Sequence, residues 1–113
     1  MPFIHVRTTK SVSKQQEEAL VSRFGAAMPL IHKSEQWLMV GCEEKCRLYF
    51  QGSDEKDLCF VTVAVFGAVK EEDADKLTAA ITDAVAAELS ITPDCIYIQY
   101  QEASTWGWNG SNF

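Results

Sequence analysis

The chain lacks any apolar run near the roughly 18 residues that a helix needs to cross a bilayer. Residues 1–7 also lack the basic segment, long apolar core and cleavage site of a signal peptide. We therefore expect a cytoplasmic protein without a membrane partner. If the protein is secreted, it leaves the cell by a route that needs no signal peptide.

Positive charge is scarce. Lys and Arg together number 10 against 16 Asp and Glu, which gives a net charge of −6 at pH 7. Such a chain has no broad basic surface to replace the counterions around phosphates, and this argues against nucleic acid as a partner. A local cationic pocket is still compatible with this balance.

Motifs for metals, phosphates and common nucleophiles are missing as well. There is no Gly-rich phosphate loop, no Ser nucleophile elbow and no zinc-binding His pair. Cys42 and Cys46 depart from the usual zinc-ligand spacing, and no His closely follows Cys59 or Cys95. Thiols normally stay reduced in a chain without a secretory signal, so we expect four free cysteines. Because the motifs above are missing, we also expect no metal and no organic cofactor.

What is present fits one folded domain over residues 1–113, with ordinary apolar (47%) and charged (23%) content. Two segments predict helices because apolar residues recur at three-to-four spacing. The first has Ser13 as its N-cap and ends near His32, with a kink at Pro29. The second begins at the acidic residues 71–73 and ends before Pro93.

Five segments rich in β-formers predict strands. They are residues 2–8, a strand that begins at 37–40, a short strand at 47–50, and residues 58–66 and 95–101. The nearly continuous apolar run at 58–66, ended by Gly67, predicts a central strand buried on both faces. The tail at 106–113 is broken by Gly and Asn and can hold a short strand at most.

The order is therefore β-α-β followed by β-α-β, an α+β fold with a four-stranded sheet and both helices on one face. The opposite face would be open in a single chain, and its apolar side chains would need cover. Association of several copies into a closed ring would provide that cover.

Pro2 is the most unusual candidate for chemistry. Initiator Met is normally trimmed before a small residue, and its removal would leave a free secondary amine on the first residue of a strand. Burial among apolar groups disfavours the ammonium form, so such an amine could act as a general base near pH 7. The alternative is that Pro2 merely begins a strand, where its missing N–H costs nothing.

Three segments resemble the macrophage migration inhibitory factor family: Met1-Pro2-Phe3-Ile4, residues 91–100 and residues 107–113. The likeness also includes Phe50-x-Gly52-Ser53 and covers the whole chain. It implies a tautomerase-type β-α-β-β-α-β fold assembled as a homotrimer with sites at the subunit interfaces. It also implies keto-enol tautomerase activity on phenylpyruvate-like 2-keto acids or dopachrome-type compounds, with Pro2 as the catalytic base.

The resemblance assigns further substrate-binding roles, and for Lys33, Phe66 and Gln99 there is also a structural alternative. Lys33 would pair with the substrate carboxylate, or be a solvated surface charge. Phe66 would lie where a backbone amide holds the ligand, or pack in the core. Tyr97 of a neighbouring subunit would cover the substrate. Gln99, on the same strand face, would donate an amide hydrogen bond, or pair across strands on a wet face.

An aromatic rim would complete the pocket and keep the amine dry. The resemblance places four residues in it: Trp37, Trp106, Trp108 and Phe113. The alternative is a C-terminal tail whose aromatic side chains pack against a neighbouring subunit, and both descriptions can hold together.

Three departures from the family stand out. His32-Lys33-Ser34 replaces the usual Gly-Lys-Pro, which removes the usual glycine helix stop and leaves the direction of Lys33 open. Gln99 replaces the Asn of the vertebrate cytokines. Only Cys59 occupies the place of the cytokine Cys-x-x-Cys, so we expect no thiol oxidoreductase activity. The alternative function is a cytokine-like ligand that binds a cell-surface receptor and keeps a residual pocket.

Overall fold

A computed structural model describes all residues, 1–113. Its central element is a mixed four-stranded sheet in the order β2-β1-β3-β4. The strands are β1 (Pro2–Thr8), β2 (Met39–Glu43), β3 (Cys59–Phe66) and β4 (Ile96–Ala103). Strand β1 pairs in parallel with β2 and antiparallel with β3, and β3 pairs in parallel with β4.

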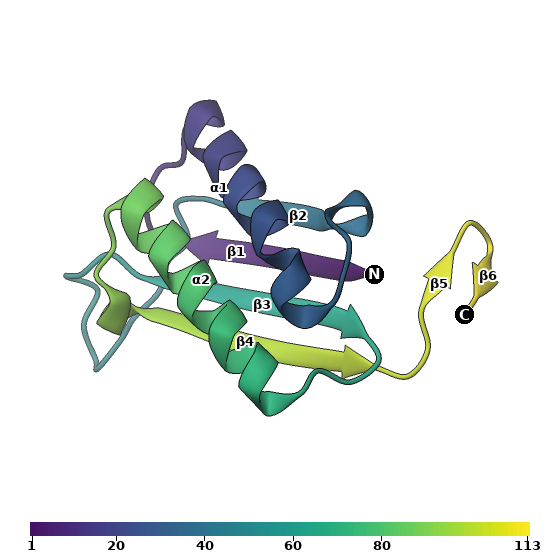
Figure 1. Cartoon of the computed structure of the whole chain (residues 1–113). Helices are drawn as coiled ribbons and strands as arrows, with labels where there is room; N and C mark the ends of the chain where they lie inside the picture. The colour runs from purple at the N-terminus through teal and green to yellow at the C-terminus, as the bar shows by residue number, and fades with distance from the viewer.

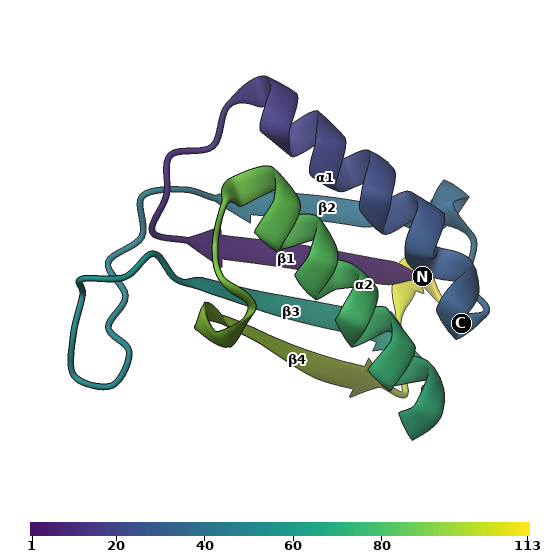
Figure 2. The same cartoon turned by 60° about the vertical axis from the view of Figure 1, so that its left-hand side comes forward.

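Two helices, α1 (Lys14–Ala27) and α2 (Glu71–Leu89), lie side by side on one face of this sheet (Figures 1 and 2). The predicted α+β architecture is thus confirmed. Neither helix is both long and apolar enough to span a membrane. The remaining elements, β5 (Gly107–Trp108) and β6 (Ser111–Asn112), form a small C-terminal hairpin beyond the end of the sheet, on the side where the N-terminus lies.

Helix α1 begins at the predicted N-cap, and the helical segment ends at His32 with an interruption at Pro29, where the sequence predicts a kink. Ser13 and Gln16 form a reciprocal capping box, which satisfies two backbone N–H groups of the first turn. The α-helix stops at Ala27 and tightens into the 3₁₀ turn Met28–Ile31, because Pro29 cannot donate to an α-helical bond. His32 then adopts the left-handed conformation, with φ 59°, that glycine usually supplies.

One buried cluster of 21 apolar residues lies between the sheet and the helices. Val61, Val63 and Val65 of β3 belong to this cluster together with Leu77 and Ile81 of α2, and all five are fully buried. The Tyr100 hydroxyl fastens β4 to α2, since it donates to the Ala74 carbonyl at 2.8 Å and meets the Thr78 hydroxyl at 2.9 Å.

The other sheet face is open. Strand β3 is central, as predicted, but on this face only Thr62 is buried, whereas Phe60, Ala64 and Phe66 are partly exposed. Burial of β3 on both faces is therefore wrong for the single chain. At the edges of the same face Met39 is 66% exposed and Tyr97 56% exposed.

Two predicted strand segments are corrected. Residues 47–50 form no strand, because they find no sheet partner within the chain. Only Phe50 pairs, through a tight bridge to Ser53 across the turn at Gln51 and Gly52. Trp37 does not begin β2; it ends the 3₁₀ turn Glu35–Trp37, which the Ser34 side chain caps.

Candidate active site

Pro2 begins β1 and is buried beside β3, where its Cα partner is Val65. With Met1 attached, the Pro2 nitrogen belongs to a peptide bond and has no basic lone pair. The Met1 carbonyl accepts a hydrogen bond from the Phe66 backbone N–H at 3.3 Å. While Met1 is attached, the Phe66 N–H is therefore already engaged in a hydrogen bond.

Lys33 lies beside this end of the sheet. The turn at His32 directs the chain so that the Lys33 ammonium donates to the Phe66 carbonyl at 3.0 Å. The exchange of glycine for histidine at position 32 therefore does not turn Lys33 away. His32 also approaches Asp73 at the start of α2, with 3.3 Å between Nε2 and Oδ2, which ties this loop to the segment after β3.

The amine at the start of the chain has an altered acidity. Burial, and then the nearby positive charge of Lys33, lower the pKa of the Met1 amine below its ordinary value. Both causes disfavour the charged ammonium. The environment at this end of the sheet thus favours a neutral amine.

The C-terminal hairpin lies at the same end of the molecule as the N-terminus (Figure 2). Its aromatic side chains contact residues of this end. The Phe113 ring lies 5.5 Å from the Phe66 ring, and the Trp108 ring packs edge-on against Trp37 at 5.1 Å. The Trp106 carbonyl accepts from the Phe113 N–H at 3.0 Å, which closes the hairpin. The four predicted rim residues therefore gather near Pro2 within one chain.

Tyr97 and Gln99 lie elsewhere. Tyr97 pairs with Phe60 in the β3–β4 register, six residues before Phe66. At about 3.3 Å per strand residue, this separates Tyr97 from the Pro2 end by about 20 Å. Both side chains point to the open face and are exposed, and the Gln99 side chain accepts one hydrogen bond, from the Gln101 amide at 3.4 Å. A single chain does not bring them to Lys33.

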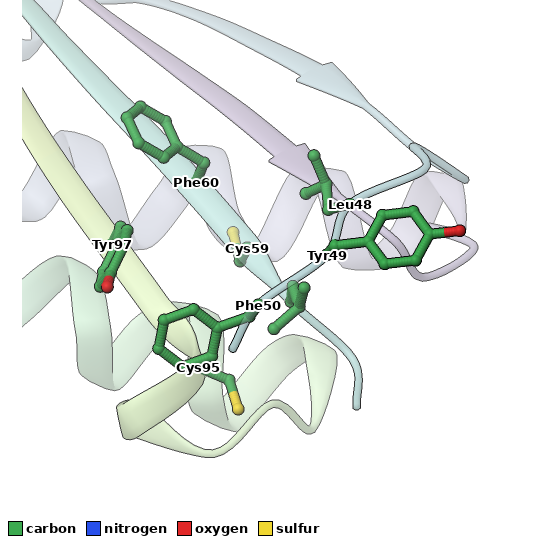
Figure 3. Close-up of a pocket in the computed structure, with 8 residues that line it drawn as sticks. Leu48, Tyr49, Phe50, Cys59, Phe60, Cys95 and Tyr97 are labelled. Atoms are coloured by element: carbon green, nitrogen blue, oxygen red, sulfur yellow. The ribbon is translucent and has the colours of Figure 1, made fainter. Parts of the chain in front are cut away.

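Tyr97 instead lines an apolar cavity of about 100 Å³ at the far end of the sheet (Figure 3). The Phe50 ring packs edge-on against Tyr97 with 5.4 Å between centroids. Tyr49 points away from this pair and is 70% exposed. Eight residues line the cavity: Leu48, Tyr49, Phe50, Leu58, Cys59, Phe60, Cys95 and Tyr97.

All four cysteines are free thiols. Burial raises the pKa of Cys42 to about 11 and that of Cys59 to about 12. Both thiols are thus poor nucleophiles at neutral pH. No three His, Cys, Asp or Glu side chains lie close enough to hold a metal ion together.

The sequence did not predict a role for His5 and Arg7 of β1. The alternation of Phe3, His5 and Arg7 nevertheless places these three residues on one face of the strand. The structure shows that this is the open face. His5 approaches Glu43 of β2, with 3.0 Å between Nε2 and Oε2. The Arg7 guanidinium lies over the Phe60 ring at 5.3 Å.

The whole chain, residues 1–113, matches the sequence profile of the macrophage migration inhibitory factor (MIF) family. No curated protein sequence matches it. Among solved structures, it is similar to MIF2 of Leishmania major, with 28% identity and a TM-score of 0.94, over 100% of this chain and 97% of that one.

Two further structures share the fold. The MIF homologue of Prochlorococcus marinus has 25% identity and a TM-score of 0.88, over 98% of each chain. The MIF of Toxoplasma gondii has 22% identity and a TM-score of 0.91, over 98% of this chain and 99% of that one. The chain thus belongs to the macrophage migration inhibitory factor family, within the tautomerase superfamily.

Proposed function

We propose that the protein is a keto-enol tautomerase that uses the Pro2 amine as its general base after removal of Met1. The observation that carries the proposal is the environment of the chain start. Burial and Lys33 lower the pKa of the Met1 amine, and the Lys33 ammonium, which donates to the Phe66 carbonyl, lies close enough to this end to pair with an anionic substrate. Members of the tautomerase superfamily are generally isomerases, which agrees with this chemistry.

Removal of Met1 would have two effects on the site. It would turn the Pro2 nitrogen into a secondary amine, and it would free the Phe66 N–H that now donates to the Met1 carbonyl. The freed N–H and the Lys33 ammonium would then both face a substrate, as donors for a carbonyl and a carboxylate oxygen. One processing event would create the base and a donor together.

The reaction moves one proton. The neutral Pro2 amine takes a proton from the carbon next to the substrate carbonyl, and the C–H electron pair becomes part of a C=C bond. The carbonyl oxygen becomes an enolate and receives the proton to give the enol. Lys33 would hold the carboxylate of a phenylpyruvate-like acid, while Trp37, Trp106, Trp108 and Phe113 would bury its ring.

We further propose that the site is completed in a homotrimer. Tyr97 and Gln99 lie on the open face of their own chain, about 20 Å and about 13 Å along the sheet from the Pro2 end, so a role at the site requires a neighbouring copy. The open face, with exposed Met39 and Tyr97 at its edges, is the surface that such an assembly would cover. Light scattering at micromolar concentration tests this, and a stable monomer would contradict it.

The test of the activity combines intact mass with an ultraviolet assay of 4-hydroxyphenylpyruvate enolisation. The mass must first show that Met1 is gone. We expect Pro2→Gly to lower kcat/KM at least about 100-fold with little change in thermal stability, because general base catalysis typically contributes 10²–10⁴-fold. A processed wild type no faster than the variant would sink the enzyme proposal and favour a receptor-binding role.

A further inference from the structure

The loop that carries Lys33 contacts the connection between β3 and α2 at two points. The Lys33 ammonium donates to the Phe66 carbonyl at 3.0 Å, and the adjacent His32 places Nε2 3.3 Å from Oδ2 of Asp73. Phe66 is the last residue of β3, and Asp73 lies in the first turn of α2. Two neighbouring side chains therefore hold the connection 66–73 at its two ends.

The connection 66–73 is itself fastened to the sheet. The Gly67 N–H donates to the Ala103 carbonyl at 2.9 Å, and the Val69 N–H donates to the Glu102 carboxylate at 2.6 Å. Both acceptors lie at the end of β4. A loop that is held to this connection is thereby held to the sheet as well.

Asp73 is a suitable anchor for His32. Its side chain is only 14% exposed, and it lies at the N-terminus of α2, where the helix dipole favours a negative charge. An imidazole with a proton on Nε2 is attracted to a carboxylate at this distance in both its neutral and its charged form. The His32 ring is 81% exposed, so water competes for the contact, and its loss should shift the loop rather than unfold the domain.

The backbone of His32 sets the direction of Lys33. Its φ of 59° turns the chain after the 3₁₀ turn, and the Lys33 N–H then donates to the Met28 carbonyl at 3.2 Å. A glycine would adopt this conformation more readily, but it has no side chain to contact Asp73. Histidine at this position thus exchanges backbone ease for a side-chain link to α2.

We propose that His32 is a positioning residue, which through its contact with Asp73 keeps Lys33 in place for the substrate carboxylate. This inference rests on the proposed tautomerase function. A substrate carboxylate competes with the Phe66 carbonyl for the Lys33 ammonium, and this weakens one of the two contacts of the loop. The contact between His32 and Asp73 does not involve the ammonium, so it continues to hold the loop while the substrate binds.

The first test is independent of catalysis. Hydrogen exchange of the Lys33 backbone amide, followed by NMR on protein shown by mass to lack Met1, reports on the stability of the turn. After correction for intrinsic rates, we expect exchange about twofold to fivefold faster in Asp73→Ala and in His32→Gly, the range that corresponds to one exposed charged contact. Glu72→Ala is the matched control, because it removes an exposed carboxylate from the same helical turn and should leave the rate unchanged.

The second test separates positioning from general disturbance of the pocket. In both variants KM for 4-hydroxyphenylpyruvate should rise about twofold to fivefold with kcat unchanged, whereas KM for its methyl ester, which lacks the carboxylate charge, should stay at the wild-type value. The double variant His32→Gly/Asp73→Ala should show no further rise, because both changes remove the same contact.

Unchanged Lys33 exchange in both variants would overturn the proposal. An equal rise in KM for the acid and the ester would overturn it too, because His32 would then support the pocket as a whole. A wild type that does not enolise 4-hydroxyphenylpyruvate would instead contradict the proposed function, and the exchange rates would still decide whether His32 and Asp73 hold Lys33. If one variant fails to fold, the other provides both comparisons.

Discussion

The two ends of the sheet differ in how much of the predicted site a single chain builds. At the Pro2 end, Lys33 and Phe66 are joined by a 3.0 Å hydrogen bond, and Phe113 packs on Phe66. Toward the other end, Tyr97 is exposed beside an apolar cavity, and the Gln99 side chain has one hydrogen bond, from Gln101. A single chain therefore brings together only the residues at the Pro2 end, and under the proposed trimer a neighbouring copy would supply Tyr97 and Gln99.

The substitution Lys33→Ala should have the largest effect, and it tests whether the Pro2 end of the sheet binds the substrate. If the Pro2 end binds the substrate carboxylate, the variant loses a charge-assisted hydrogen bond, typically about 1.5–3 kcal/mol. Since about 1.4 kcal/mol corresponds to tenfold, we expect KM for phenylpyruvate to rise about 10- to 100-fold. Steady-state kinetics should show a smaller change in kcat.

Lys76→Ala supplies the control, because Lys76 is an exposed lysine on α2. Its KM should match that of the wild type. An unchanged KM in Lys33→Ala would show that the lysine is only a structural link to the Phe66 carbonyl.

An experiment that mixes two variants tests whether Tyr97 serves the site of a neighbouring subunit. Tyr97→Ala should lower kcat/KM about threefold to tenfold, because it removes one ring that covers the substrate. When Tyr97→Ala and Pro2→Gly subunits are unfolded and refolded together, some interfaces would combine a native Pro2 with a native Tyr97. We expect the mixture to be more active than the sum of the two variants refolded alone.

Refolding with no gain above that sum would place Tyr97 and Pro2 of one site in the same chain, or Tyr97 outside the site. Mass spectrometry of the intact assemblies must confirm that mixed oligomers form. This condition separates a failed exchange of subunits from a failed prediction.

The smallest expected effect concerns alkaline pH. Burial raises the pKa of Cys59 to about 12 and of Cys42 to about 11, above the ordinary thiol value of 9.0. Unfolded thiols then lose their protons first, so the stabilisation is complete below about pH 9 and is lost as pH rises toward 11 and 12. Urea unfolding should show a shallower loss of stability in Cys59→Ala than in the wild type over this range.

Cys46→Ala, which alters a partly exposed loop thiol, serves as control and should follow the wild-type pH profile. The amine end responds with the opposite sign. The pKa of the Met1 amine is lowered from 8.0, so its contribution to stability is fully present above pH 8.0 and is lost as pH falls through the lowered value. An identical alkaline profile in Cys59→Ala and wild type would contradict the thiol prediction.

The sequence was informative wherever one short-range rule decides the structure. Capping at Ser13, the acidic first turn of α2 and the apolar run ending at Gly67 each specify a boundary from adjacent residues. The hydrophobic periodicity then fixes which face of each helix meets the sheet. These local signals sufficed for the element order and for both helices on one side.

Long-range partners were harder to predict. Residues 47–50 have strand-like composition, but a strand needs a neighbour, and none lies beside them in the chain. His32 adopts the left-handed conformation that non-glycine residues rarely take, and no periodic pattern indicates it. Lys33 and Phe66 lie 33 residues apart in the sequence and are joined by a hydrogen bond. Only the resemblance to a family, and not their spacing, placed them in one predicted site.

The hydrogen bond from Phe66 to the Met1 carbonyl has a practical consequence for anyone who prepares this protein. If Pro2 is the base, two batches with the same purity, size and melting temperature can differ in specific activity, because an aminopeptidase trimmed one batch more completely. The fraction of trimmed chains then becomes the proper denominator for every turnover number. Expression hosts and yields that overload the aminopeptidase would produce inactive subunits indistinguishable in shape from active ones.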